Sequence, residues 1–442
     1  MTMLAMAFRE QVKKTKDYSQ INEMSYSVSY RTGFPNFDFA NGYIQEIDGV
    51  LNYELGLSDG SINMIISDSG VGKTTLCTQI ACNIVKHFKT SAVFYEQAEV
   101  GTNIQRIKNL TGFNTNEEFM NRFVIRDAGI TIESIYDRVR MIHDIKLDNS
   151  DKYLYDTGLK DMAGRSIFKY EPTIVIVDSV KMVMSKKNSM ASETSNMTGA
   201  TNAKANSEYY TKMVPLCREA NIIMLLINHI TVDVNTGFMP KKSELPYLKQ
   251  GEHISGGRSL TYIQNCIFRL DIKSKLKPEE GFGITGSIVN IDVVKSRTNK
   301  TARARCALVF DQENGYDPDL SMFITLKEEK LIEGAGAYMK LPNYDVKFSQ
   351  KNFKNMLQKD PDFYNAFARL SLDYLTKNIV DEYTRMSAES KKQTEHVSPY
   401  DAILAQMGHP TINSDIVKEV NNTTNDEAEP VNVDDDESYD NN

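Results

Sequence analysis

The chain has 442 residues, of which 41% are hydrophobic and 25% charged, enough for a large core and for up to two domains. No run of 18 apolar residues occurs, and the apolar part of MTMLAMAFREQVKK is too short for a secretory signal, so we expect a cytoplasmic protein with no membrane partner. The five cysteines form no C-x-x-C pair and are odd in number, which favours small buried hydrophobes over disulfides or a zinc site.

The net charge of -8 is concentrated at the end of the chain. Residues 423–442 carry eight Asp or Glu and no Lys or Arg, which accounts for the whole net charge. The acidic composition therefore does not exclude a nucleic-acid partner, because a basic face can be offset elsewhere. We expect residues 396–442 to form a flexible region that ends in this acidic tail, since they offer few apolar residues for a core.

Taken in chain order, the sequence predicts an α/β core. Residues 1–30 are polar with scattered apolar positions, and LAMAFREQVKK could form a short amphipathic helix, either as a linker or as an arm on a neighbouring molecule. From residue 63 to about 230, short apolar runs such as SAVFYE and TIVIVDS alternate with helical patterns, which predicts a parallel sheet covered on both faces.

After about residue 262 the pattern changes. Three strands follow in quick succession (QNCIFRLDIK, GSIVNIDVVKSR and ARCALVFD), and we expect them to extend the same sheet in antiparallel fashion. The predicted core thus spans residues 31–330, with a helical C-terminal region over 331–395. Residues 184–206 and 231–255 lack a clear period and are rich in polar residues, so we expect two long, functional loops.

INMIISDSGVGKTTL, residues 62–76, matches the phosphate-loop pattern G-x-x-x-x-G-K-[ST] except at its first position, where Ser67 stands. Serine can replace glycine there if the backbone stays in an ordinary conformation. Lys73 would reach the β- and γ-phosphates, and the Thr74 hydroxyl would bind Mg²⁺. The predicted ATP-binding residues are Ser69, Gly70, Val71, Gly72, Lys73, Thr74, Thr75, Asp178 and Arg106.

Carboxylates follow two of the predicted strands. Asp178 ends EPTIVIVDS about 100 residues after the phosphate loop, which favours a second magnesium-site residue beside Thr74. Glu96 and Glu99 follow SAVFY, and either could orient or deprotonate the attacking water. Spacing alone does not choose between these two glutamates.

Several segments, in this order and spacing, resemble the RecA-like recombinases and, within them, the UvsX recombinases of T-even-like bacteriophages. The likeness covers about residues 31–325 and is carried by RTGFPNFDFANG, GLSDGSINMIISDSGVGKTT, FYEQAEVG, IVIVDSV, LLINHI, ISGGRS, VVKSRT and VFDQENGYDP. The resemblance implies a RecA-like P-loop ATPase that uses ATP and Mg²⁺, forms a helical filament through its N-terminal arm, and binds single- and double-stranded DNA. It also implies single-strand-binding and mediator proteins as partners, and a host-cell cytoplasm.

The resemblance assigns further roles by position. His229 falls at the γ-phosphate sensor, and Lys295 and Arg297 fall where the family supplies cations to the neighbouring subunit's ATP. The family's D-x-E is here E-x-x-E; alignment on Glu99-x-Gly101 favours Glu99, whereas counting from the strand end favours Glu96.

The resemblance places DNA at the two long loops. Lysines there could contact phosphates, and Phe238, Met239 and Tyr247 could stack against bases, with little sequence preference. The predicted DNA-binding residues are Lys186, Lys187, Lys204, Phe238, Met239, Lys241, Lys242, Gly256, Gly257 and Arg258, and Lys249 adds a cation to the second loop. The acidic tail could compete with duplex DNA for the same basic surface.

The leading interpretation is a DNA-dependent ATPase that polymerises on single-stranded DNA and catalyses homologous pairing and strand exchange in recombination-dependent replication and repair. Two alternatives share the core. One is a hexameric replicative helicase, although only about 60 residues precede the phosphate loop. The other is a recombinase paralogue that binds ATP and acts as a scaffold without turnover, which the departures at Ser67 and E-x-x-E motivate.

Overall fold

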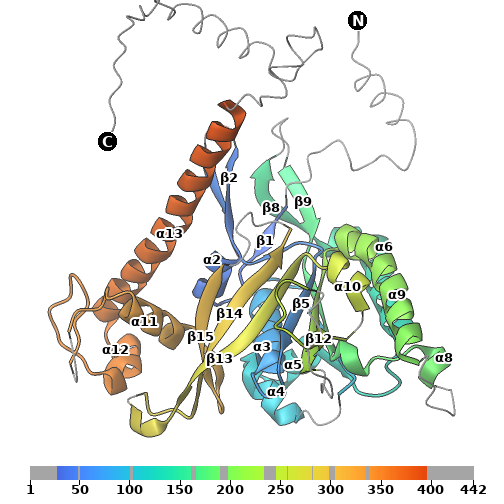
Figure 1. Ribbon diagram of the computed structural model, residues 1–442, viewed down its shortest axis with the longest axis horizontal. Helices are drawn as coiled ribbons and strands as arrows, with labels where there is room; N and C mark the ends of the chain where they lie inside the picture. The colour runs from blue at the N-terminus through green and yellow to red at the C-terminus, as the bar shows by residue number, and fades with distance from the viewer. Residues whose placement is uncertain are drawn as a thin grey trace, which may run out of the picture. The chain divides into compact units, whose positions relative to one another are not determined.

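The protein is an α/β fold built on a large mixed sheet, seen here in a computed structural model (Figure 1). The structure describes residues 27–47, 50–99, 103–160, 166–189, 198–232, 245–255, 257–280, 282–297, 304–334 and 338–395. The N-terminal arm before residue 27 and the tail after residue 395 were predicted but lie outside these residues. No helix in the described ranges is long and apolar enough to cross a bilayer.

The sheet has a parallel centre and an antiparallel flank, as the sequence predicted. β13, β5, β11, β10, β6 and β7 are mutually parallel neighbours, whereas β14, β15 and β16 continue the sheet in antiparallel order and β12 pairs with the end of β11. In spatial order the strands are β16 (Gly315–Asp317), β15 (Arg305–Asp311), β14 (Gly286–Ser296), β13 (Cys266–Leu276), β5 (Ile62–Ser67), β11 (Ile222–Val232), β10 (Thr173–Asp178), β6 (Val93–Gln97) and β7 (Phe123–Arg126), with β12 (Glu252–Ile254) beside β11.

Helices cover both faces because the central strands are apolar on both sides. One face packs against α2 (Pro35–Ala40), α3 (Lys73–Val85), α4 (Ile104–Thr111) and α5 (Asn116–Arg122). The opposite face packs against α6 (Ile132–Asp148), α9 (Thr198–Ala220) and α10 (Gly257–Ile263), which Figure 1 shows together on one side of the sheet. All five cysteines are buried in this core, as predicted, and no two of them form a disulfide.

A third apolar cluster lies on the antiparallel flank. It joins the strands β13 to β15 to α11 (Pro318–Glu328), α12 (Phe353–Lys359) and the first half of α13 (Pro361–Glu395), with the short helix η4 (Gln350–Asn352) before α12. The predicted C-terminal helical region is therefore present. The chain divides into two compact units, Met1–Ile379 and Val380–Asn442, and only residues 380–395 of the second are described.

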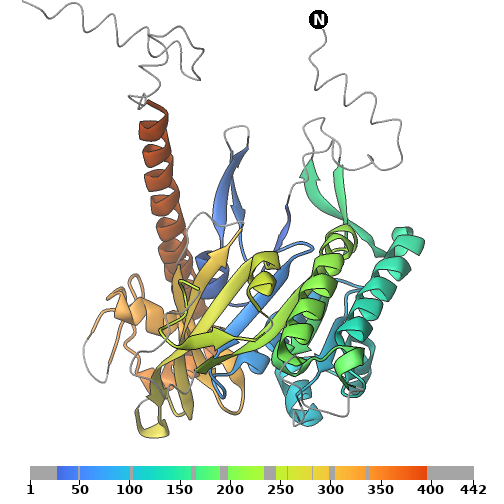
Figure 2. The ribbon, with the colours of Figure 1, turned by 45° about the vertical axis from the view of Figure 1, so that its right-hand side comes forward.

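Several small elements were not predicted. Two hairpins, β2–β3 and β8–β9, project from the same side of the sheet in both ribbon views (Figure 2). The remaining elements are β1 (Ser29–Tyr30), β2 (Tyr43–Ile47), β3 (Val50–Glu54), β4 (Leu57–Ser58), α7 (Ser150–Tyr153), β8 (Leu154–Lys160), β9 (Ser166–Tyr170), η2 (Val180–Met182), α8 (Lys186–Ser189) and η3 (Pro278–Glu280).

Both predicted long loops are shorter than expected. α9 begins at Thr198, so residues 198–206 are helical, and residues 186–189 form α8. Thr231 and Val232 belong to β11, and residues 252–254 form β12. The central parts of the two predicted loops, residues 190–197 and 233–244, lie outside the described residues.

Candidate nucleotide site

The phosphate-loop sequence runs from the end of β5 to the start of α3, as predicted. Gly70 and Gly72 have left-handed backbone angles, with φ of 79° and 99°, which side chains rarely adopt. Among the described non-glycine residues, positive φ occurs at Asn221, Lys330 and Asn343, so Ser67 keeps an ordinary backbone. The missing first glycine is therefore tolerated by the loop geometry.

Lys73 lies folded across this loop. Its ammonium donates to the carbonyl oxygens of Ser67 (3.1 Å) and Asp68 (2.7 Å) and to Ser67 Oγ (3.1 Å). The side chain is buried, and this burial lowers the pKa of Lys73 to about 8, against the opposing effect of Asp178 and Glu99. A bound anion would offset the cost of burying this cation.

Asp178 ends β10 and faces the first turn of α3. Its Oδ2 accepts hydrogen bonds from Thr74 Oγ1 at 2.7 Å and from the Tyr95 hydroxyl at 2.8 Å. Burial raises the pKa of Asp178, while these two hydrogen bonds act in the opposite direction. The carboxylate and hydroxyl oxygens thus meet beside the loop and provide the hard oxygen ligands that Mg²⁺ prefers.

Glu99 and His229 lie beside Lys73 and Asp178 and are hydrogen-bonded to them or to each other. The Glu99 backbone N–H donates to the Asp178 carbonyl at 2.9 Å, and Glu99 Oε2 lies 3.1 Å from His229 Nε2. His229 Nδ1 lies 3.4 Å from Lys73 Nζ, and since an ammonium only donates, Nδ1 is the acceptor and Nε2–H donates to Glu99. β11 fixes this position by pairing His229 with Ser67 of β5.

Glu96 does not lie at this site. Side chains alternate along β6, so Tyr95 faces Asp178 while Glu96 points to the other face of the sheet. There its carboxylate is buried and ion-paired to Arg126 Nε at 2.6 Å and Arg138 Nε at 2.7 Å. Of the two glutamates predicted as candidates for the base, the structure places Glu99 beside the phosphate loop and Glu96 on the other face of the sheet, which favours Glu99.

Lys295 and Arg297 lie near the amino ends of the parallel strands, whereas the phosphate loop lies at their carboxyl ends. Lys295 pairs with Ile267 at the start of β13, and the neighbouring Cys266 pairs with Asn63 at the start of β5, whereas the phosphate loop follows the end of β5. Lys295 Nζ donates to the Thr261 carbonyl at 2.5 Å, and Arg297 donates to the Tyr262 carbonyl. One chain therefore does not bring these cations to its own phosphate loop.

Arg106 of α4 and Tyr316 both contact the C-terminal strands, but only Tyr316 also contacts the phosphate loop. Arg106 Nη1 donates to the carbonyl of Gln312, in the turn before β16, at 2.8 Å. Tyr316 of β16 is buried, and its hydroxyl donates to the Val71 carbonyl at 3.0 Å. Neither Tyr316 nor Tyr95 was predicted from the sequence. For Tyr95 the signal was the alternation of side chains along the strand, which turns Tyr95 and Glu96 to opposite faces.

The predicted DNA-binding residues that the structure describes lie on three helices, and α9 contacts both α8 and α10. Lys186 and Lys187 form the exposed start of α8, and Lys204 lies within α9 instead of a loop. Gly257 and Arg258 begin α10. Phe238, Met239, Lys241, Lys242 and Gly256 lie outside the described residues.

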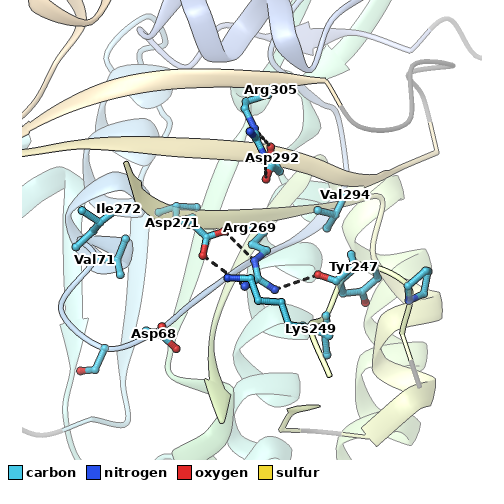
Figure 3. A pocket seen from close by; sticks show the side chains of 14 residues that line it. Asp68, Val71, Tyr247, Lys249, Arg269, Asp271, Ile272, Asp292, Val294 and Arg305 are labelled. Atoms are coloured by element: carbon cyan, nitrogen blue, oxygen red, sulfur yellow. Dashed lines mark hydrogen bonds and ion pairs between the residues drawn. The ribbon is translucent and has the colours of Figure 1, made fainter. Parts of the chain in front are cut away.

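A cavity of about 890 Å³ adjoins the outer side of the phosphate loop (Figure 3). One wall is the loop itself, a second is formed by β13, β14 and β15, and residues 246–249 close a third side. Its lining residues are Asp68, Ser69, Val71, Pro246, Tyr247, Leu248, Lys249, Arg269, Leu270, Asp271, Ile272, Asp292, Val294 and Arg305. No family model matches the chain.

Proposed function

We propose that this protein is an ATP-dependent DNA recombinase that forms a helical filament on single-stranded DNA and catalyses homologous pairing and strand exchange. The observation that supports this most is a convergence at one edge of the parallel sheet. Lys73 and Thr74 of α3 meet Asp178, Glu99 and His229, which come from three other segments, beside a glycine-containing loop. Such a set of groups is typical of phosphoryl-transfer sites.

The residues present fit ATP with Mg²⁺. A Cβ on Gly70 would meet nothing within 4 Å, so the loop has open space on this side. Residues 69–75 and the helix N-terminus would hold the phosphates, with Lys73 as the buried cation. Thr74 and Asp178 would hold the metal, which supplies charge stabilisation during phosphoryl transfer.

The chain's own groups then have separate roles. Glu99 is the base that orients the attacking water and takes its proton, and its side chain is accessible enough to meet that water, with 46% exposed. His229 holds the Glu99 carboxylate by one nitrogen and meets Lys73 by the other, so it connects the base to the phosphate-binding cation. Lys295 and Arg297 lie away from the phosphate loop of their own chain and would act instead on a neighbouring chain's site.

The DNA and filament parts of the proposal rest on the resemblance to RecA-like recombinases, with Lys186, Lys187 and Lys204 as phosphate contacts. A head-to-tail interface that places Lys295 and Arg297 on a neighbour gives an open filament when the rotation does not close.

The test combines ATP hydrolysis with electron microscopy of the full chain. We expect single-stranded DNA to stimulate hydrolysis, Lys73→Ala to abolish it, and helical filaments to form with ATP and DNA. Closed rings as the only assembly would instead support the helicase. Wild-type turnover equal to that of Lys73→Ala would support a scaffold without turnover.

A further inference from the structure

Tyr95 of β6 brings a buried hydroxyl to the proposed magnesium site. Its side chain is fully buried, and its ring lies 6.1 Å from that of Phe123 in the core that β6 shares with α3. The hydroxyl donates to Asp178 Oδ2 at 2.8 Å, and the same oxygen accepts a hydrogen bond from Thr74 Oγ1 at 2.7 Å. One carboxylate oxygen is therefore held from the core by Tyr95 and from α3 by Thr74.

The sheet fixes the position from which this hydroxyl acts. Tyr95 pairs with Ile176 of β10, two residues before Asp178. Because residues two apart on a strand point to the same face, Tyr95 and Asp178 lie on one face of the sheet. The terminal torsion of an aspartate side chain has a broad energy well, so the backbone alone does not fix the rotation of the carboxylate. A donor on a ring that is packed in the core does fix it.

The direction of the hydrogen bond from Thr74 matters for a cation. A hydroxyl carries one proton and two lone pairs, whereas an ionised carboxylate only accepts. Thr74 Oγ1 gives its proton to Asp178, so its lone pairs are left for a metal ion. This arrangement holds only while the Asp178 carboxylate keeps its orientation, and the hydrogen bond from Tyr95 maintains that orientation.

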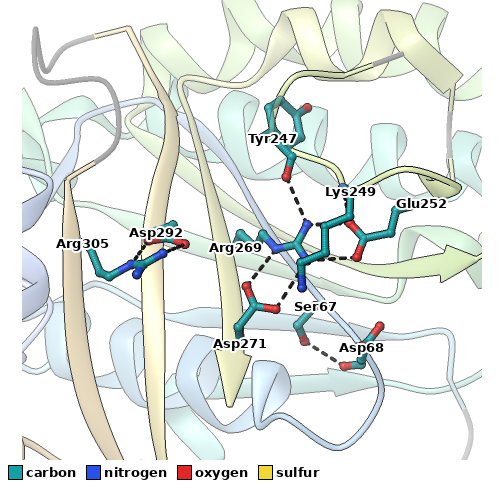
Figure 4. Close-up of polar contacts among 9 residues, drawn as sticks. All are labelled: Ser67, Asp68, Tyr247, Lys249, Glu252, Arg269, Asp271, Asp292 and Arg305. Atoms are coloured by element: carbon teal, nitrogen blue, oxygen red, sulfur yellow. Dashed lines mark hydrogen bonds and ion pairs between the residues drawn. The ribbon is translucent and has the colours of Figure 1, made fainter. Parts of the chain in front are cut away.

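Two carboxylates of the adjoining cavity are held by arginines instead. Asp271 accepts from Arg269 Nε at 2.8 Å (Figure 4). Asp292 accepts from Arg305 Nη2 at 2.9 Å in the same view. The Asp178 side chain differs, because the two groups that hold its Oδ2 are neutral hydroxyls. Its negative charge is therefore left to offset a divalent cation.

We propose that Tyr95 is a positioning residue for the divalent cation: its hydroxyl holds the Asp178 carboxylate in the orientation in which Asp178 and Thr74 bind Mg²⁺ together. The inference rests on the proposed function for the ligand, which is ATP with Mg²⁺. Tyr95 acts only through Asp178. Loss of such an outer partner typically lowers metal affinity by about 10–100-fold, so removal of the hydroxyl should weaken the metal and leave the phosphate contacts intact.

The test measures the affinity of the full chain for a fluorescent, non-hydrolysable ATP analogue over a range of free Mg²⁺ concentrations, and again in EDTA. In the wild type we expect Mg²⁺ to strengthen binding, with a midpoint concentration that reports on the metal site. In Tyr95→Phe this midpoint should rise by about tenfold or more, while the affinity in EDTA stays unchanged. The variant keeps the ring and its packing, and urea unfolding checks that it is folded.

Tyr210→Phe is the matched control. Tyr210 of α9 is also fully buried, but its hydroxyl has no hydrogen-bond partner among the described residues, so this variant should match the wild type in Mg²⁺ and in EDTA.

A wild-type midpoint in Tyr95→Phe would overturn the role of Tyr95 and leave the proposed function intact. An equal loss of affinity in EDTA, or an equal shift in Tyr210→Phe, would also overturn it, because the hydroxyl would then act on the packing of the site in general. A wild type whose binding ignores Mg²⁺ would contradict the magnesium site of the proposed function, and the role of Tyr95 with it.

Discussion

At the scale of single residues, the two glutamates of FYEQAE lie in different surroundings, and the proposed function gives them different roles. Glu99 faces His229 and the phosphate loop, whereas Glu96 neutralises Arg126 and Arg138 on the other face. We expect Glu99→Gln to slow ATP hydrolysis by about 10²–10⁴-fold with ATP affinity retained, because the proposed general base is lost.

We expect Glu96→Gln to lower the free energy of unfolding by about 1–3 kcal/mol instead. Hydrolysis rates and urea unfolding of both variants check this; the reverse pattern would restore Glu96 as the base.

The two glycines of the loop differ in what surrounds them. A Cβ on Gly70 meets nothing within 4 Å, but on Gly72 it would lie 2.8 Å from the Tyr316 hydroxyl. We expect Gly70→Ala to cost about 1–2 kcal/mol from its left-handed backbone alone, and Gly72→Ala to cost more. Adding Tyr316→Phe to Gly72→Ala removes the colliding oxygen, so the double variant should be more stable than the sum of the single effects. Urea unfolding of the wild type, Gly72→Ala, Tyr316→Phe and the double variant measures this, and strict additivity would refute the collision.

At the scale of elements, Lys146 attaches α6 to the amino ends of two central strands. It donates to the carbonyls of Glu171 and Ala220, at 2.7 and 2.8 Å, just before β10 and β11. Burial lowers the pKa of Lys146 to about 7 from 10.5, so between these values the unfolded chain binds more protons than the folded one. The free energy of unfolding should therefore rise with pH across this window, by at most about 1.4 kcal/mol per unit.

Urea unfolding at several pH values would measure this slope. Lys146→Met should lower this slope, because no proton is then released on folding at this position; Lys73, whose pKa is also lowered, keeps its own contribution above about pH 8. Lys212→Met removes a half-exposed lysine of α9 and should keep the slope. Equal slopes in all three proteins would mean that Lys146 keeps its proton in the fold.

The elements that the sequence predicted best are those with a strong apolar pattern. The runs ending in Ser67, Asp178 and His229 became adjacent parallel strands, and this adjacency brings the site together. The start of α9 was missed because TGATNAKAN is rich in poor helix formers. In the structure, Asn202 in this part accepts hydrogen bonds from the Ser185 N–H and from Asn188 Nδ2, residues far enough away in the sequence that no local pattern shows them. To choose between Glu96 and Glu99 one must know which side chains at the end of β6 point towards the phosphate loop. A count from the end of the strand does not show this.

At the scale of the whole molecule, Lys295 and Arg297 lie across the sheet from the phosphate loop of the same chain, so their proposed role requires an interface. A mixture of two inactive variants tests this. Lys73→Ala lacks an intact loop, and Lys295→Ala/Arg297→Ala lacks the cations. Mixed in equal amounts on single-stranded DNA, they should recover about a quarter of the wild-type hydrolysis rate, because in a random head-to-tail order one interface in about four joins an intact loop to intact cations. Recovery should disappear when Lys73→Ala also carries Lys295→Ala/Arg297→Ala. A mixture no more active than its parts, with filaments still formed, would show that these cations do not act between chains.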